Sequence, residues 1–302
     1  MNKISAPYIA LLIGVVAVST SAIFVKLANA PAPVIAFYRL FFSVLLMSPL
    51  FLLKYRHEIK IISKRDWLMS AVAGVFLAFH FILWFESLNY TSVASSTVLV
   101  TLQPIFAFIG TYLFFKEKAG YKALLSGGIA IIGSFIISWG DFKISGMALF
   151  GDLLALVSCA MVTAYLLFGQ TVRKRLSLIT YTFIVYGIST LTLFLYVVLL
   201  QYPIIPLDNG DWIYFLLLAV VPTLLGHSLF NWSLKWLSTS VISMSILFEP
   251  IGAGVLAYYI LGENVVWTQV VGGVIIILGI SLYAVSEKKK PRVKEAKSLN
   301  AS

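Results

Sequence analysis

The chain has 302 residues, of which 60% are hydrophobic and only 11% are charged, and its mean hydropathy is +0.97. Soluble domains carry roughly 25% charged residues, so this composition excludes a water-soluble fold and predicts a surface that faces lipid. The net charge of +10 does not indicate nucleic-acid binding, because the basic residues cluster at the ends of apolar segments.

Ten apolar stretches follow one another along the chain. A bilayer core of about 30 Å needs roughly 20 apolar residues per helix, and each stretch is close to that length. They lie near residues 7–28, 34–53, 67–88, 93–115, 120–139, 147–168, 179–200, 211–233, 240–261 and 266–286. The pattern predicts an all-α integral membrane protein with ten transmembrane helices, numbered here as spans 1 to 10.

The basic residues predict the orientation of these spans. With the N-terminus in the cytoplasm, nineteen of the 22 Lys and Arg fall on the cytoplasmic side, as the positive-inside rule requires. The exceptions are Lys26, Arg39 and Lys143. The sequence therefore predicts a multi-pass protein of the inner or plasma membrane with both termini cytoplasmic. The basic segment 287–302 is expected to be a solvated cytoplasmic tail, with contact to lipid headgroups as the alternative.

The two halves of the chain resemble each other. A shift of 146 residues aligns 87–133 with 233–279 and gives 12 identities in 47 positions without a gap, among them Pro104 with Pro250 and Glu117 with Glu263. The predicted organisation is a first repeat at 1–141, a second repeat at 142–286 and the basic tail. Five spans per repeat is an odd number, so the second repeat enters the membrane from the opposite side. Such inverted repeats are typical of secondary transporters, whose solute site lies at the repeat interface, although some channels and membrane enzymes are also duplicated.

Polar residues at membrane depth are candidates for the solute site, because they are costly to bury in a bilayer. Glu249 precedes Pro250 halfway along span 9, and Gln103 precedes Pro104 at the matching place in span 4. Each proline removes a backbone hydrogen bond and is expected to kink its helix. The alternative is that Gln103 and Glu249 only stabilise the kinks and the packing between helices.

Spans 3 and 8 carry a second matched set of polar and aromatic residues. His80 and Trp84 are four residues apart in span 3 and share one helical face, as His227 and Asn231 do in span 8, where Trp232 follows. A histidine within a span can bind solute or accept a proton near neutral pH. A structural hydrogen bond between helices is an equally good interpretation.

Spans 1 and 2 add further candidates near the outer face. Tyr38 and the cluster Ser19–Ser21 could line a pore, or the small residues could serve close packing. Arg39 and Lys26 are expected to extend to the lipid headgroups, with pairing of Arg39 to Glu86 or attraction of an anionic solute as alternatives.

Enzyme and cofactor motifs do not occur in the sequence. There is no P-loop, no Gly-x-Ser-x-Gly and no His-Glu-x-x-His motif. The three His and one Cys are widely spaced, so no metal site and no cofactor is expected.

Several short motifs follow one another in both halves of the chain. They include Phe37-Tyr-Arg39, Leu102-Gln-Pro-Ile-Phe106, and Leu247-Phe-Glu-Pro250 with Leu261-Gly-Glu263. Together and in this order they resemble the EamA-like group of the drug/metabolite transporter superfamily. The resemblance implies ten helices around a central cavity, alternating access, and export of amino acids, other metabolites or drugs by exchange or proton coupling. Many relatives carry Trp-Gly in the first span, where this chain has Val18-Ser-Thr-Ser-Ala22, so an aromatic lining from span 1 is not expected.

The resulting hypothesis is a secondary transporter with a small-molecule solute held between spans 1, 3, 4, 6, 8 and 9. If protons are coupled to transport, Glu249 is the first candidate to carry them, and His80 and His227 are the next. A nucleotide-sugar or other anionic-metabolite exchanger, a channel-like facilitator and a membrane enzyme or assembly subunit are the alternatives. The sequence predicts neither the solute nor the oligomeric state.

Overall fold

The computed structural model describes residues 6–288 apart from 117, 140–145, 206–207 and 264–266. Several residues used in the sequence argument lie outside the described residues. These are Glu117, Lys143 and nearly all of the basic tail.

The described chain is helical, and its apolar helices account for the ten predicted spans. Eight helical segments are long and apolar enough to cross a bilayer, and two shorter apolar helices, Tyr121–Ile136 and Val270–Tyr283, occupy the positions of spans 5 and 10. The prediction of an all-α membrane protein with ten helices is confirmed.

The first five spans contain seven α-helices and two short irregular helices. They are α1 (Ala6–Val18), α2 (Ser21–Leu27), α3 (Ala32–Leu50), η1 (Phe51–Tyr55), η2 (Arg56–Ile61), α4 (Lys64–Ser87), α5 (Val93–Val100), α6 (Gln103–Phe115) and α7 (Tyr121–Ser138).

The last five spans contain seven α-helices and two π-helical segments. They are α8 (Gly146–Val172), α9 (Leu178–Leu199), α10 (Asp211–Leu218), η4 (Ala219–His227), α11 (Ser228–Ser233), α12 (Thr239–Ile246), α13 (Glu249–Leu256), η5 (Ala257–Leu261) and α14 (Trp267–Lys288).

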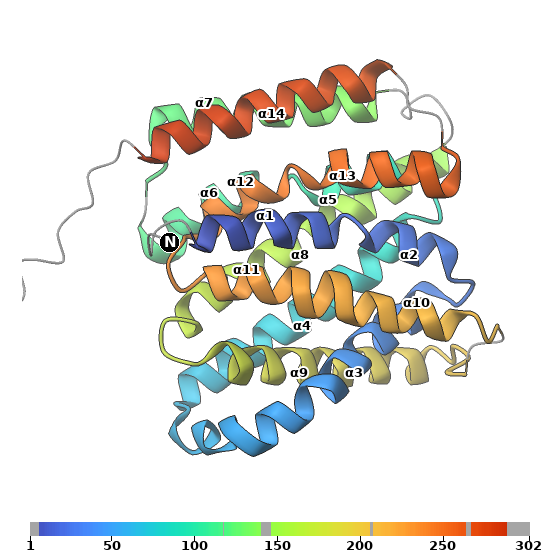
Figure 1. The fold of residues 1–302 in the computed structure, drawn as a ribbon, viewed down its shortest axis with the longest axis vertical. Helices are drawn as coiled ribbons and strands as arrows, with labels where there is room; N and C mark the ends of the chain where they lie inside the picture. Colours follow the sequence, from blue (N-terminus) through green and yellow to red (C-terminus); the bar gives the residue numbers. More distant parts are fainter. Residues whose placement is uncertain (1–5, 117, 140–145, 206–207, 264–266, 289–302) are drawn as a thin grey trace, which may run out of the picture.

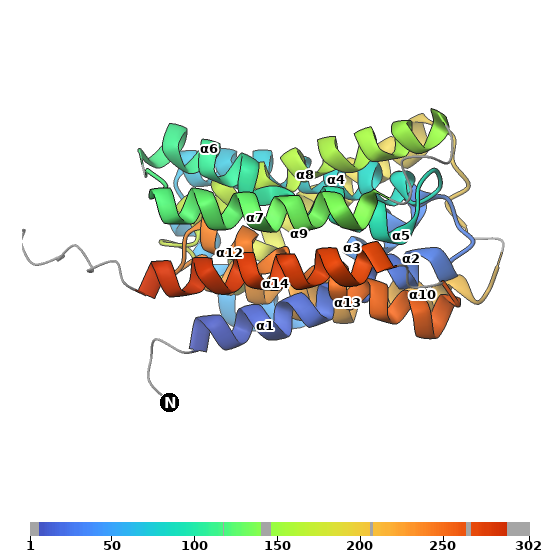
Figure 2. The same cartoon turned by 90° about the horizontal axis from the view of Figure 1, so that it is seen from above.

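All the spans run roughly along one direction, and the bundle has two ends (Figure 1). The helix α1 begins at the same end of the bundle at which α14 finishes (Figure 2). We call this the near end and the opposite one the far end. Of the Lys and Arg residues that the structure describes, all except Lys26 and Arg39 lie at the near end.

Helix packing follows the inverted repeat. Spans 5 and 10 (α7 and α14) pack along each other as a pair beside the rest of the bundle, and spans 2 and 7 (α3 and α9) form a second pair (Figure 1). Span 1 packs against span 8 through α1, η4 and α11, and its counterpart span 6 packs against span 3 through α8 and α4. The two five-helix repeats therefore make matching contacts around a common centre.

Three spans are interrupted, and the sequence indicated only two of these breaks. In spans 4 and 9 one helix ends at Val100 or Ile246 and the next begins three residues later, so that Pro104 and Pro250 sit in the first turns of new helices. In span 1 the break lies at Ser19 and Thr20, whose hydroxyls donate to the backbone oxygens of Val15 and Ala17. Hydroxyls that bond to the preceding turn bend apolar helices. Span 8 contains the π-helical segment η4, with a proline inside it.

Candidate functional site

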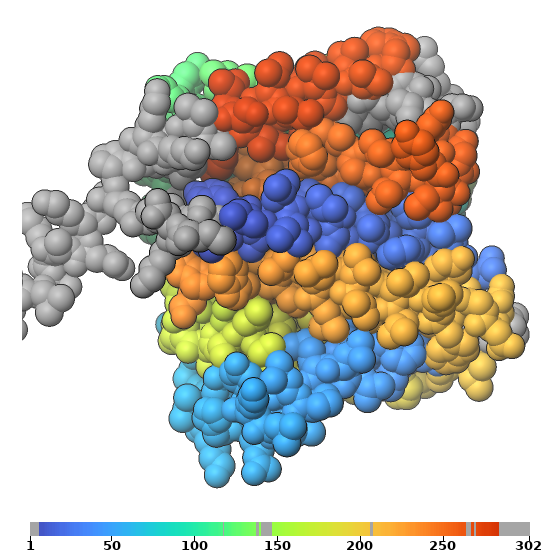
Figure 3. Space-filling view, viewed as in Figure 1, coloured from blue at the N-terminus to red at the C-terminus, as the bar shows by residue number. Residues whose placement is uncertain are grey.

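A small cavity lies at the centre of the bundle, where both repeats meet. Its walls come from spans 1, 3 and 4 of the first repeat and spans 6, 8 and 9 of the second. The lining residues are Val18, Ser21, His80, Trp84, Val100, Gln103, Val162, Leu166, His227, Phe230, Ile246 and Glu249. On the face shown in Figure 3, α1 lies between the segments 211–233 and 239–261.

The two proline breaks place their polar neighbours in this cavity. Gln103 is the first residue of α6 and Glu249 the first residue of α13, and both side chains are buried. The Nε2 atom of Gln103 lies 3.5 Å from the backbone oxygen of Val100, the carbonyl that Pro104 leaves without its usual donor. Its Oε1 atom is buried without a hydrogen-bond partner. An acceptor and a carboxylate from opposite repeats thus face the same space.

Three ring side chains of spans 3 and 8 line the cavity beside them. The rings of His80 and Trp84 are stacked, with centroids 5.7 Å apart, and the His227 ring lies 6.5 Å from His80. The Nδ1 atom of His80 lies 2.8 Å from the hydroxyl of Ser158 in span 6. The indole Nε1 of Trp84 is buried without a partner, which leaves a donor available to a bound molecule.

Arg39 does not extend to the lipid headgroups, so that expectation is wrong. Its side chain is 0% exposed, and its guanidinium donates to Thr223 Oγ1 and Ser21 Oγ, each at 2.7 Å. The guanidinium carbon lies 4.1 Å from the centroid of the Phe81 ring. The cause is the face of span 2 on which Arg39 lies, which points at spans 1, 3 and 8 rather than at lipid.

The alternative pairing of Arg39 with Glu86 is also absent from the described contacts. Glu86 accepts hydrogen bonds from Tyr90 and Asn89, its neighbours at the end of span 3. Lys26, by contrast, is exposed, and its ammonium donates to the backbone oxygen of Leu88.

Three other candidates lie away from the cavity lining. Tyr38 stacks on Phe215 with centroids 5.0 Å apart and belongs to an aromatic cluster. Asn231 is fully buried, and its amide donates to the hydroxyl of Tyr165 and to the backbone oxygen of His227. Trp232 lies nearer the near end, where its ring is tilted by 57° against that of Trp236, in a second hollow of about 290 Å³.

Some lining residues were not identified from the sequence. Ser158, Val162 and Leu166 lie on successive turns of α8 and present one face to the cavity or to His80. Their spacing of four residues was available as a signal, but span 6 has no proline, and its charged residue, Asp152, lies outside the cavity lining. Phe230 adds an aromatic wall from span 8. The cavity is therefore lined by aromatic rings, although span 1 contributes none of them.

The cavity is far smaller than an organic solute. Its volume is about 20 Å³. About 10–15 Å³ accommodates one water molecule, whereas ligand pockets measure about 300–1,000 Å³. A solute can therefore enter only if the surrounding helices move apart.

Comparison with known proteins agrees with this architecture. The chain is 24% identical over 271 residues to an uncharacterized transporter of Archaeoglobus fulgidus, covering 90% of this chain and 93% of the relative. It is 26% identical over 291 residues to the uncharacterized transporter YxxF of Bacillus subtilis, covering 96% of this chain and 93% of the relative.

A solved crystal structure shares the fold, and a family description matches both repeats. The crystal structure superimposes with a TM-score of 0.74 at 13% identity, covering 94% of this chain and 98% of the other. The sequence model of the EamA-like transporter family matches residues 5–139 and, a second time, residues 149–285. The chain thus belongs to the EamA-like transporter family and is a multi-span membrane protein.

Proposed function

We propose that this protein carries small organic solutes across the inner or plasma membrane by alternating access, with both chain ends in the cytoplasm and export as the net direction. The observation that carries the proposal is the central cavity. Helices of both repeats line it, and polar groups without hydrogen-bond partners point into it. The concentration of basic residues at the near end supports a cytoplasmic assignment for that end.

The interrupted helices favour alternating access rather than transport through a fixed channel. Spans 1, 4 and 9 line the cavity and break close to it, and span 8 becomes π-helical there. A broken helix can bend without disturbing its two rigid parts, because few backbone hydrogen bonds cross the break. The closed cavity would then open toward one end at a time.

The lining favours a solute with an apolar body and a polar end. Aliphatic and aromatic side chains form most of the wall, whereas Trp84, Gln103 and Glu249 supply a donor, an acceptor and a carboxylate. Amino acids, other metabolites and drugs fit this description. An anionic exchanger is less well supported, because Arg39 is not among the lining residues and already binds Ser21 and Thr223.

Counterflow in proteoliposomes tests the transport mechanism. Vesicles with purified protein are preloaded with a defined mixture of amino acids, nucleosides and vitamins, and uptake of each labelled compound is measured against empty vesicles. Alternating access predicts saturable uptake that the matching internal compound accelerates. Uptake that stays linear with concentration and ignores internal solute would indicate a channel-like facilitator, and no uptake of any compound class would contradict the proposed solutes.

Glu249 is the proposed site of proton coupling. It is the buried carboxylate that lines the cavity among the described residues. We expect Glu249→Gln to keep counterflow exchange but to lose uptake driven by a pH gradient. Glu86→Gln is the matched control, because Glu86 lies outside the lining and bonds only to its neighbours. A pH-gradient response that survives in Glu249→Gln would remove this residue from the coupling role.

A further inference from the structure

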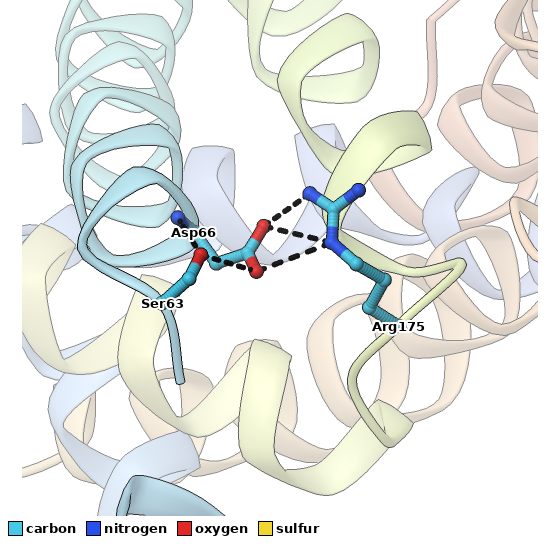
Figure 4. A network of polar contacts seen from close by, with 3 residues as sticks. All are labelled: Ser63, Asp66 and Arg175. Atoms are coloured by element: carbon cyan, nitrogen blue, oxygen red, sulfur yellow. Dashed lines mark hydrogen bonds and ion pairs between the residues drawn. The ribbon is translucent and has the colours of Figure 1, made fainter. Parts of the chain in front are cut away.

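At the near end, an ion pair holds the loop after α8 against the start of α4. Arg175 Nε donates to Asp66 Oδ1 at 3.2 Å and to Oδ2 at 3.1 Å, and a second nitrogen also binds Oδ1 (Figure 4). Ser63, the N-cap of α4, donates to the same carboxylate at 2.8 Å. The hydrogen bonds to Asp66 raise the pKa of Arg175, so the pair stays ionised. We call this the near-end contact.

At the far end, a hydrogen-bonded contact holds the loop after α2 against the start of α10. The backbone N–H of Asn29 donates to Asp211 Oδ1 at 2.8 Å, and its side-chain amide donates to Asp208 at 2.9 Å. Asp211 is 1% exposed, and its Oδ2 atom has no hydrogen-bond partner. We call this the far-end contact.

The two contacts occupy equivalent places in the inverted repeats. Asn29 and Arg175 each stand two residues before the N-cap of the next helix, Pro31 in one repeat and Ser177 in the other. Their partners also match, because span 3 begins with Asp66 followed by Trp and span 8 begins with Asp211 followed by Trp. A contact at the same place in each repeat therefore joins two spans at each end of the molecule.

The helices joined by these contacts also form the walls of the cavity. The near-end contact ties α8 to α4, and the far-end contact ties α2 to the segment that contains α10, η4 and α11. Val162, Trp84, Ser21 and His227 of these four segments line the cavity. Separating α4 from α8 at the near end, or span 1 from span 8 at the far end, requires the contact at that end to break.

We propose that the Asp66–Arg175 and Asn29–Asp211 contacts are paired gates that open in alternation and set which side the cavity faces. The proposal rests on the transport function proposed above. The gates differ in strength, because the near-end contact joins two opposite charges through the two-pronged fork of an arginine, whereas neutral donors bind the carboxylates of the far-end contact. The far end consequently opens more readily, and the unpartnered oxygen of Asp211 marks the place where its repeat counterpart receives an arginine.

A single-cysteine reporter tests the gates without any solute. Cys159→Ala removes the one native cysteine, which is buried, and Val162→Cys places a thiol on the cavity wall. A membrane-impermeant maleimide is applied to the near or the far side of oriented vesicles, and the labelling rate is measured. Arg175→Asn is expected to raise near-side labelling by about 5- to 10-fold, in line with the loss of a charge-assisted pair. Asn29→Arg is expected to lower far-side labelling by a similar factor.

Two further variants separate gating from misfolding. Lys174→Gln removes a neighbouring exposed charge that does not contact Asp66, and its labelling should not change. The double exchange Asp66→Arg with Arg175→Asp rebuilds the pair and should restore slow near-side labelling. Unchanged labelling rates in both Arg175→Asn and Asn29→Arg would contradict the proposal of paired gates. This holds even if solute exchange is saturable and the transport function stands. Gate-dependent labelling in a protein that exchanges no solute would instead reject the proposed function.

Discussion

Arg39 shows how a single buried cation organises three spans. The guanidinium reaches from span 2 to hydroxyls of span 1 and span 8 and lies over an aromatic ring of span 3. Charges are expensive at membrane depth unless they are paired or hydrogen-bonded. The planar fork of arginine makes both bonds at once, which a lysine ammonium cannot do with the same geometry.

Replacing Arg39 by lysine should therefore destabilise the protein. We expect Arg39→Lys to lower the free energy of unfolding by about 1.5–3 kcal/mol, the range for hydrogen bonds to charged groups. Thermal unfolding in detergent measures the change. Arg65→Lys is the matched control at an exposed position, where an effect within about 0.5 kcal/mol is expected. Equal melting temperatures for both variants would mean that the buried bonds contribute nothing.

Trp84 allows the polar part of the cavity to be tested separately from its shape. Trp84→Phe keeps an aromatic ring in the wall but removes the indole N–H, which has no partner in the structure. For a solute found by counterflow, we expect the half-saturation concentration to rise about 3- to 10-fold, the value of one hydrogen bond. Trp67→Phe, at a partly exposed position away from the cavity, should leave it unchanged. An equal effect of both substitutions would contradict a contact between Trp84 and solute.

Which candidate residues reach the cavity could be predicted from the sequence only in part. Depth within a span can be counted along the chain, and this places His80, Trp84, Gln103, His227 and Glu249 at the height of the cavity. The rotation of each helix cannot be counted in the same way. Asn231 therefore lies on span 8, which lines the cavity, but its amide points at Tyr165 and at the backbone of His227 instead. Tyr38 and Arg39 lie on span 2, which does not line the cavity.

At the scale of elements, spans 5 and 10 approach each other through paired glycines. A Cβ atom on Gly133 would lie 2.7 Å from the backbone oxygen of Gly272, and one on Gly279 would lie 2.7 Å from the backbone nitrogen of Ala130. Gly133 and Gly279 are equivalent positions of the two repeats. Small residues at such crossings let helix backbones touch, which is the main source of packing between helices in lipid.

A large side chain at this crossing should separate the two helices. Gly133→Leu is expected to cost about 1–3 kcal/mol, as overpacking does elsewhere, and to lower the melting temperature. Gly128→Leu is the control on the same helix, because a Cβ atom there would meet nothing within 4 Å. If Gly128→Leu were as destabilising as Gly133→Leu, leucine would act through helix α7 itself and not through its contact with α14.

The interruptions of the spans show where sequence patterns stop being informative at this scale. Proline lacks the backbone N–H, so the breaks in spans 4 and 9 follow directly from Pro104 and Pro250. The break at Ser19 depends on a contact far away in sequence, because its hydroxyl also lies 3.3 Å from the backbone oxygen of Glu249. Serine in an apolar helix is common and does not by itself predict such a break.

At the scale of the whole molecule, hydrophobicity and repetition were sufficient to predict the fold. Lipid removes most alternatives, because the backbone polar groups must be satisfied within helices or closed barrels. The ten-helix architecture and the inverted halves were predicted for this reason. The size of the cavity could not be predicted, because it depends on how tightly side chains from six spans meet.

The orientation of the molecule in the membrane is the remaining prediction at this scale. The chain enters and leaves the described bundle at the same end, where nearly all of its described basic residues also lie. Reporters fused before residue 1 and after residue 302 should therefore both behave as cytoplasmic, with a fluorescent protein bright and alkaline phosphatase inactive. A reporter inserted at Asn209, between spans 7 and 8, should give the opposite pattern. If the two terminal reporters lay on different sides, the number of spans would be odd and the two repeats would no longer be inverted.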